Sequence, residues 1–148
     1  MDIYQLLKKD HSKVKDLFKK TKGKTKNAQE PQEDFFSEIE KELHMHMEGE
    51  EKLFYPALEQ DETTREDILK SYEEHHVVKR IIEDMGKMSR DDEKWAAKLI
   101  VLKEIVTHHI KEEESGLFKK ARKVLHKEQA QEMCNRFEEE KKNIYQMA

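Results

Sequence analysis

The sequence predicts an all-α protein, an up-down-up-down four-helix bundle with an additional C-terminal helix. Its 148 residues include only 4 glycines and 2 prolines, while 42% are charged, so turn-forming residues are scarce and helix-favouring residues dominate. Apolar residues also recur at intervals of three and four, the period of a helix with one buried face. We therefore predict a single domain over residues 1–148, with a core bundle over about 2–122 and a last helix over about 126–146.

The first two predicted helices are separated by a long polar segment. The first is expected from about Asp2 to Lys22, where the sequence TKGKTKNAQEP interrupts the apolar pattern. The second is expected to begin after Pro31 and to continue to about Gln60. Pro56 should disturb its last turns, because proline has no amide hydrogen to donate within a helix.

The next two helices are expected to follow at short intervals. Thr63 or Thr64 is placed to cap the third helix, which fades near Gly86 to Ser89. Ser89 or Asp91 is placed to open the fourth, which runs to residues 115–116. Because short connections join helices that run in opposite directions, the second, third and fourth should be antiparallel neighbours.

Composition and charge exclude several classes of protein. The 29 basic and 33 acidic residues nearly balance, so no nucleic-acid partner is expected. A lone cysteine, Cys134, excludes an internal disulfide framework and is typical of the cytoplasm. No apolar run resembles a signal peptide or approaches the length of a membrane span, so no membrane association is expected. The sequence does not predict an oligomeric state.

The placement of the eight histidines is the most informative feature. At 100° per residue, His11 lies in the middle of the apolar stripe of its helix, about 40° from Leu7 and about 20° from Phe18. The same construction places one histidine of each following bundle helix on the apolar face: His46, His75 and His109. The other four fall on polar faces or helix edges: His44, His76, His108 and His126.

A glutamate follows two of the inward histidines by one helical turn. Glu50 ends the segment HMEGE and Glu113 ends the segment HIKEE, and both share the apolar face of their histidine. A single buried histidine is ordinarily a packed core residue, and a single His-x-x-x-Glu pair is ordinarily a surface contact. Two buried carboxylates without a counter-charge would instead cost several kcal/mol each, on the order of the penalty for any unpaired buried charge. The joint pattern therefore predicts a bound cation.

The donor types narrow the choice of metal. Imidazoles and carboxylates without thiolates favour iron, manganese or zinc, and six protein ligands suit two metal ions rather than one structural zinc. A ferritin-like site would need two inward Glu-x-x-His motifs, whereas Glu73 and His76 form one that points off the core. Because a π-bulge near residues 115–116 would rotate the helix face, Glu114 is an alternative to Glu113, and His108 to His109.

Four segments of the chain closely resemble the hemerythrin-like, HHE cation-binding domain family: DHSKVKDLF, HMEGEEKLFYPAL, EEHHVVKRI and HHIKEEESGLF. The resemblance covers about residues 5–125, and the His-x-x-x-Glu-Glu stretch with its following LFYP is the most specific part. It implies a centre of two iron ions joined by an oxo or hydroxo group. The implied ligands are four terminal histidines and two bridging glutamates: His11, His46, His75, His109, Glu50 and Glu113.

One position departs from the family pattern. The oxygen-carrying hemerythrins have a further histidine four residues before the one that matches His75, and here that position is Ser71. One iron should then keep an open or water-filled position, or use another side chain such as Tyr72. This departure argues against reversible oxygen carriage.

Three functions follow as hypotheses. The leading one is a non-haem di-iron protein that binds oxygen, peroxide or nitric oxide as a sensor, scavenger or carrier. The first alternative is a di-iron enzyme with peroxidase-like, catalase-like or nitric-oxide-detoxifying activity. The second is a metal-free helical interaction module, for which the inward histidines would need another explanation. The sequence does not decide whether the protein is an enzyme.

Overall fold

The computed structural model describes residues 1–21 and 34–147, with only the backbone for residues 144–147. Within these ranges the chain is helical and contains no strand, which confirms the predicted all-α class. The predicted end of the first helix at Lys22, the start of the second after Pro31 and the segment between them lie outside the described residues. No helix of the described ranges combines the length and the apolarity needed to cross a membrane.

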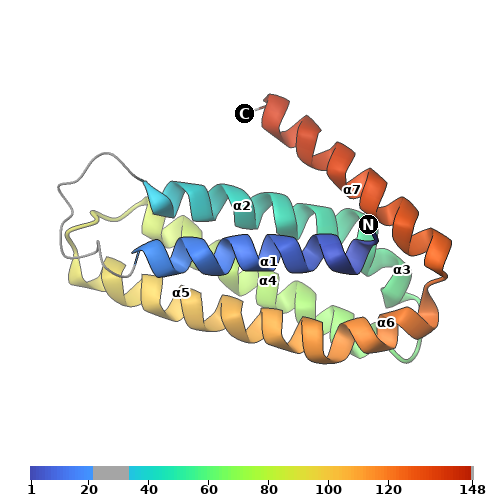
Figure 1. The fold of residues 1–148 in the computed structure, drawn as a ribbon. Helices are drawn as coiled ribbons and strands as arrows, with labels where there is room; N and C mark the ends of the chain where they lie inside the picture. The colour runs from blue at the N-terminus through green and yellow to red at the C-terminus, as the bar shows by residue number, and fades with distance from the viewer. Residues whose placement is uncertain (22–33, 148) are drawn as a thin grey trace.

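Four long helices lie side by side and alternate in direction, as predicted (Figure 1). They are α1 (Ile3–Thr21), α2 (Phe35–Gly49), α4 (Arg65–Gly86) and α5 (Glu93–Glu112). The additional C-terminal helix, α7 (Lys127–Met147), runs obliquely across one end of the bundle and packs against α1 and α2.

Two of the long helices continue through a π-helical turn into a short helix. After α2 come the turn η1 (Glu50–Phe54) and the helix α3 (Tyr55–Glu59). After α5 come the turn η2 (Glu113–Leu117) and the helix α6 (Phe118–Val124). The disturbance of the second helix therefore begins at Glu50, earlier than the position of Pro56 predicted, and the fourth helix continues beyond residues 115–116.

Aspartate caps fix two of the helix starts. The side chain of Asp34 accepts a hydrogen bond from the Ser37 amide at the start of α2, and Asp92 accepts one from the Lys94 amide at the start of α5. The fourth helix thus opens after Asp92, not at Ser89 or Asp91, because the Asp92 carboxylate satisfies an amide that the first turn leaves unpaired. Thr64 precedes α4 as predicted, although its side chain makes no capping hydrogen bond.

Most of the buried hydrophobic side chains in the described part of the chain form two clusters, one toward each end of the bundle. One cluster includes Leu7, Phe54 and Phe118, and the other includes Val14 and Leu102. The inward histidines lie between these clusters, since His11 stands on α1 between Leu7 of one and Val14 of the other. The core thus surrounds a polar layer with hydrophobic residues on both sides.

Candidate metal centre

The structure brings the six predicted ligands together in the interior. One histidine comes from each of α1, α2, α4 and α5, and the two glutamates begin the two π-helical turns. All six side chains are buried: His11, His46, His75, His109, Glu50 and Glu113. The four remaining histidines are exposed, as the sequence predicted: His44, His76, His108 and His126.

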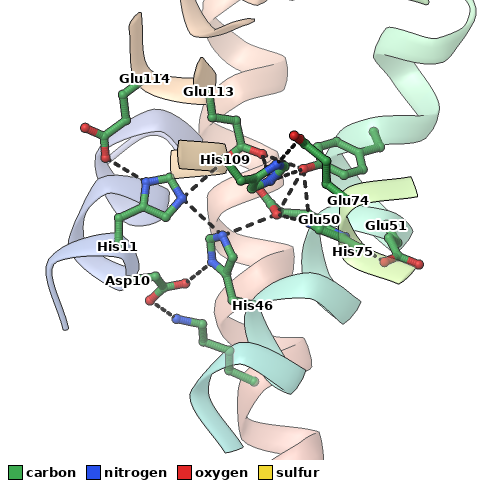
Figure 2. A network of polar contacts seen from close by, with 12 residues as sticks. Asp10, His11, His46, Glu50, Glu51, Glu74, His75, His109, Glu113 and Glu114 are labelled. Carbon is green, nitrogen blue, oxygen red and sulfur yellow. Dashed lines mark hydrogen bonds and ion pairs between the residues drawn. The ribbon is translucent and has the colours of Figure 1, made fainter. Parts of the chain in front are cut away.

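The imidazoles form two pairs (Figure 2). Nε2 of His11 lies 3.2 Å from Nε2 of His46, and this pair, which we call the first half-site, joins α1 to α2. The rings of His75 and His109 lie 5.0 Å apart and form the second half-site, between α4 and α5. Each half-site therefore offers two imidazole nitrogens toward the centre.

Glu113 connects the two half-sites. Its Oε1 lies 3.3 Å from Nε2 of His11, and its Oε2 lies 3.0 Å from Nε2 of His109. Oε1 of Glu50 is also shared, at 3.3 Å from Nε2 of His46 and 3.2 Å from Nε2 of His75. Both glutamates thus lie where a carboxylate could bridge two cations.

Two carboxylate oxygens at this centre are buried without a hydrogen-bond partner among the described residues, Oε2 of Glu50 and Oε1 of Glu113. The two side chains are 0% and 2% exposed. Unpaired buried carboxylate oxygens are costly in a protein interior, and a bound cation would remove that cost. The donor atoms are also close enough to bind a metal ion. Those of His11, His46, Glu50 and Glu113 lie within 4.8 Å of one another, and those of His75, His109 and Glu50 form a second group of the same size limit. The residues therefore fit a pair of metal ions.

A second ring of carboxylates orients the imidazoles from outside (Figure 2). Each histidine presents its Nδ1 to an acidic side chain of a neighbouring helix or π-helical turn. The four contacts are Asp10 to His46 at 3.1 Å, Glu51 to His75 at 2.7 Å, Glu74 to His109 at 2.6 Å and Glu114 to His11 at 2.6 Å. A carboxylate at Nδ1 fixes the orientation of the ring and raises the basicity of the other nitrogen, which is the usual arrangement behind a histidine ligand.

The positions of these outer carboxylates repeat between the two halves of the chain. In α1 and α4 the acid directly precedes the histidine, as Asp10 precedes His11, and in η1 and η2 it directly follows the inner glutamate, as Glu114 follows Glu113. The structure thus separates the alternatives that the sequence left open. Glu113 faces the centre and Glu114 contacts His11 from outside, while His109 faces inward and His108 is exposed.

The π-helical turns bring an unpredicted residue, Tyr55, into the centre. The Tyr55 amide donates to the carbonyl of Glu50, five residues earlier, and the extra residue in this turn returns the Tyr55 side chain to the face of Glu50. The Tyr55 hydroxyl donates to Glu50 Oε1 at 3.1 Å and to Glu113 Oε2, and lies 3.3 Å from Nε2 of His109. The matching position after the second π turn is Phe118, which carries no hydroxyl.

Ser71 and Tyr72 lie next to Tyr55 rather than at the metal ligands. Ser71 is buried, and its side chain acts to lower the pKa of the neighbouring Tyr55 hydroxyl, against the larger effect of burial. The ring of Tyr72 packs edge-on against that of Tyr55, with centroids 5.4 Å apart. Tyr72, which the sequence offered as one alternative to an open position, therefore packs on Tyr55, and Tyr55 is the side chain that contacts the inner glutamates.

Burial and close opposite charges shift the pKa values of the residues at this centre. Burial lowers the pKa of His46, but the Glu50 and Asp10 carboxylates outweigh that effect and raise the pKa to about 10. Burial opposes ionisation of Glu113, yet His109 and His11 hold its pKa well below the usual range. Burial, with the Glu113 and Glu50 carboxylates, raises the pKa of Tyr55 well above 10. The raised pKa of His46 and the lowered pKa of Glu113 thus favour opposite charges on the imidazoles and the carboxylates.

Comparison with known proteins agrees with this geometry. The profile of the family described as Hemerythrin HHE cation binding domain matches residues 2–121. The chain belongs to this family. The predicted resemblance to hemerythrin-like domains is thereby confirmed, and cation binding is the property that the family description states.

Two individual proteins are similar over nearly the whole chain. A DNA nickase from Nostoc sp. (strain PCC 7120) is 30% identical over 146 residues, which are 99% of this chain but only 41% of that protein. The crystal structure of a Hemerythrin HHE cation binding domain-containing protein, the Rv2633c homolog from Mycobacterium kansasii, has a TM-score of 0.77. It is 22% identical and the match covers 97% of this chain and 89% of that one, which shows a shared fold.

The hemerythrin-like centre is covered differently on its two sides. Over the first half-site, the α7 residue Phe137 packs against Gly49 and lies 6.3 Å from the ring of His46, measured between centroids. Lys141 of α7 donates to Asp10, the carboxylate that holds His46. The second half-site has no such contact with α7 among the described residues.

Among the described residues, an apolar and a polar cavity border the centre. The small apolar cavity, of about 20 Å³, is lined by the four imidazoles and six hydrophobic side chains: Val14, Leu43, Met47, Val78, Val106 and Ile110. A larger polar cavity of about 260 Å³ lies beside the second half-site and is lined in part by Ser71, His109 and Glu113. Cys134 is buried and lines neither cavity, and burial raises the pKa of its thiol to about 11, which disfavours the reactive thiolate.

Proposed function

We propose that the protein holds two iron ions, one in each half-site, and binds a small ligand there. Glu113 carries the proposal, because it directs one carboxylate oxygen to each half-site while Oε1 lacks a hydrogen-bond partner. A carboxylate in this position bridges two cations naturally, whereas a single ion would leave one imidazole pair without a function. In the proposed assignment the ligands are His11, His46, Glu50 and Glu113 on one side, and His75, His109 and the same two glutamates on the other.

Iron is preferred because of the donor set and the outer carboxylates. Nitrogen and oxygen donors without thiolate suit iron, and an open position is available once Ser71 replaces a histidine. A redox-active iron pair would supply electrons to a bound oxidant. The chain itself orients the imidazoles through Asp10, Glu51, Glu74 and Glu114, and hydrophobic residues pack on both sides of this polar layer.

The small apolar cavity limits the size of the ligand. Its volume of about 20 Å³ is close to the space that one water molecule needs, so a diatomic molecule or peroxide fits and a larger substrate does not. Apolar walls favour an uncharged diatomic over an ion, because a charge there would lose its hydration. Oxygen, nitric oxide and peroxide are therefore the candidate ligands, in a sensor, scavenger or carrier.

Tyr55 favours an enzymatic function as a second candidate. Its hydroxyl lies 3.3 Å from Nε2 of His109, beside the second half-site, and its raised pKa keeps it protonated. A protonated phenol can donate a hydrogen bond, and then a proton, to a peroxide oxygen held nearby. Turnover of peroxide by the iron-loaded protein, lost in Tyr55→Phe, would favour the enzyme over a carrier.

The name of the Nostoc relative raises a separate question. That protein is described as a DNA nickase, but this chain spans only 41% of its length. The expectation that this chain has no nucleic-acid partner is still a prediction. A mobility-shift titration with duplex and nicked DNA, with and without iron, tests it.

The first test is metal content per chain, measured by elemental analysis after anaerobic reconstitution with ferrous iron. We expect about two irons per chain, with iron charge-transfer absorption that is lost in His46→Ala/Glu50→Ala. The matched control is His44→Ala/Glu48→Ala, an exposed pair with the same spacing on the same helix, which should retain both irons. One zinc ion per chain would contradict the proposal. A folded protein, as judged by circular dichroism, that binds no metal would also contradict it and would leave the metal-free helical module as the function.

A further inference from the structure

An outer group of potential ligands stands on the protein surface beside the second half-site. Glu74, His108 and Glu112 place their ligand atoms within 4.8 Å of one another. His108 is 62% exposed at its side chain, and its Nε2 lies 2.9 Å from Oε1 of Glu112, one helical turn along α5. Glu74 comes from α4 and also holds Nδ1 of His109 through Oε1. The outer group is thus linked by one carboxylate to a proposed ligand of the inner centre.

The polar cavity connects this outer group to the buried centre. Glu74 and Glu112 line its exposed part, and His109 and Glu113 line its buried part. Glu113 is 2% exposed, and its Oε1 is one of the two unpartnered buried carboxylate oxygens. A cation that leaves the outer group therefore meets oxygen and nitrogen donors along the cavity wall until it reaches the proposed site.

The charges around the cavity suit a cation better than an anion. Four carboxylates line it: Asp67, Glu74, Glu112 and Glu113. Two lysines also line it, but each is already paired with one of these carboxylates. Lys70 Nζ lies 3.1 and 3.0 Å from the two oxygens of Glu112, and Lys120 Nζ lies 2.8 Å from Asp67. An excess of carboxylates in a cleft raises the local concentration of cations.

The opposite side of the centre offers a contrast. There α7 covers the first half-site, with Phe137 against Gly49 and Lys141 on Asp10. Lys141 places a positive charge on that side, at the carboxylate behind His46. Among the described residues, an open acidic cavity therefore lies next to His109, whereas α7 covers the side of the centre next to His46.

We propose that the polar cavity is the route by which metal ions load the centre, and that Glu74, His108 and Glu112 form a transient outer site for a divalent cation. The outer site captures the cation and replaces part of its hydration shell, and Glu113 then accepts it inside. Lys70 competes for Glu112 and is displaced when the cation binds. This proposal rests on the proposed metal centre, and it assigns His108 a function distinct from that of His109.

The test measures how fast the metal-free protein takes up Co²⁺, a spectroscopic substitute for ferrous iron, in a stopped-flow instrument at low ionic strength. His108→Ala should slow uptake by roughly tenfold, the lower end of what a charged, ligand-lined cleft contributes to association rates, with the final cobalt content unchanged. The matched control is His44→Ala, because His44 is exposed and has Glu48 one helical turn away. It should load like the unmodified protein.

Two further variants test the route and the sign of the charge. Gly116 lines the cavity and a Cβ there meets no atom within 4 Å, so Gly116→Phe should fold, reach into the cavity and slow uptake. Gly86→Phe is its control, since Gly86 is equally unobstructed and lies away from the cavity. Lys70→Met should speed cobalt uptake about two- to threefold by freeing Glu112, and this gain should shrink in high salt.

The possible results separate this proposal from the metal centre itself. If the unmodified protein takes up no cobalt at equilibrium, the proposed function fails. If it takes up two ions but His108→Ala and Gly116→Phe load at the unmodified rate, the centre stands and the loading route is overturned. Slower uptake in Lys70→Met would also overturn it, because removing a positive charge that competes for Glu112 should not slow the entry of a cation.

Discussion

The Tyr55 hydroxyl donates a hydrogen bond to Oε2 of Glu113, the carboxylate that connects the two half-sites. Tyr55 begins α3 and Glu113 begins η2, so the contact joins the two chain segments in which a long helix passes through a π-helical turn. The corresponding aromatic residue on the other side is Phe118, which has no hydroxyl. The two half-sites, similar in their imidazoles and outer carboxylates, differ at this point.

We predict that Tyr55→Phe lowers the free energy of unfolding of the metal-free protein by about 1.5–3 kcal/mol, the usual contribution of a hydrogen bond to a charged group. The loss arises because Glu113 and Glu50 keep their buried charge but lose a donor. Tyr72→Phe is the control, since Tyr72 packs on Tyr55 without contacting either glutamate, and surface-type changes stay within about 0.5 kcal/mol. Urea denaturation of both variants measures the difference; equal stabilities would contradict the hydrogen-bonding role of Tyr55.

The outer carboxylates should tune the two half-sites separately. Glu114→Gln should weaken metal binding at the first half-site, because Glu114 lies 2.6 Å from Nδ1 of His11. Glu51→Gln should weaken the second, through Nδ1 of His75 at 2.7 Å. Each loss should be about 10–100-fold in affinity, as for other carboxylates behind histidine ligands. Competition with a chelator measures it, and Glu48→Gln, on the surface of α2, should change nothing.

If either outer variant lost both metal ions equally, the two half-sites would not be independently supported. Loss of one ion per chain in each variant would show that they are. Isotopic labelling of the histidine rings distinguishes which pair is vacated, since the Nε2 resonances of His11 and His75 report on different half-sites.

Stability of the metal-free protein should vary with pH in a definite direction. The pKa of each inner histidine is raised above 6.5, so the stability that these residues contribute is fully present below pH 6.5. It is lost as the pH rises through the folded pKa values, that of His46 being about 10. Glu51, Glu74, Glu113 and Glu114 have pKa values below 4.5, so their contribution is present above pH 4.5 and is lost as the pH falls.

These groups together place the stability maximum of the metal-free protein between about pH 4.5 and 6.5, measured by chemical denaturation across the pH range.

Metal binding should follow the opposite trend above pH 6.5. Because the imidazoles must lose their protons before they can bind a metal, apparent affinity should rise with pH and binding should release protons into a weak buffer. An affinity that stays constant from pH 6 to 9 would contradict the assignment of the histidines as ligands.

The inward faces of the bundle were predictable because the helices are regular up to the residues in question. His11, His46, His75 and His109 all lie within uninterrupted α-helices, so an angle of 100° per residue places each of them correctly. Burial of all four follows from the apolar stripe that surrounds each histidine on its helix.

Tyr55 was not predictable from the same arithmetic. Five residues of regular α-helix would turn Tyr55 by about 140° from Glu50 and point it away from the centre. The π-helical turn returns it, and the rotation depends on one backbone hydrogen bond, from the Tyr55 amide to the Glu50 carbonyl. Pro56 signalled a disturbed helix, but not where the disturbance begins.

The outer carboxylates were missed for a different reason. Asp10 and Glu74 are adjacent to inward histidines, so each lies about 100° from the apolar stripe and is read as a surface residue on its own helix. Their partners are on neighbouring helices, His46 on α2 and His109 on α5, and such contacts depend on how the helices pack. The repeated acid–His pairs at residues 10–11 and 74–75 were the available signal.

Packing of α7 on the first half-site gives the last prediction. A Cβ on Gly49 would lie 2.3–2.7 Å from ring atoms of Phe137, which is 0% exposed and cannot swing into solvent without unpacking α7. Overpacking of this kind costs about 1–3 kcal/mol, against a gain of roughly 1 kcal/mol for replacing a helical glycine with alanine. Gly49→Ala should therefore lower the free energy of unfolding, whereas Gly116→Ala, where a Cβ meets no atom within 4 Å, should leave it unchanged or raise it. Thermal denaturation of the two variants measures the difference. If Gly49→Ala were as stable as Gly116→Ala, α7 would not pack on α2 in solution. Lys141 would then not reach Asp10 behind His46.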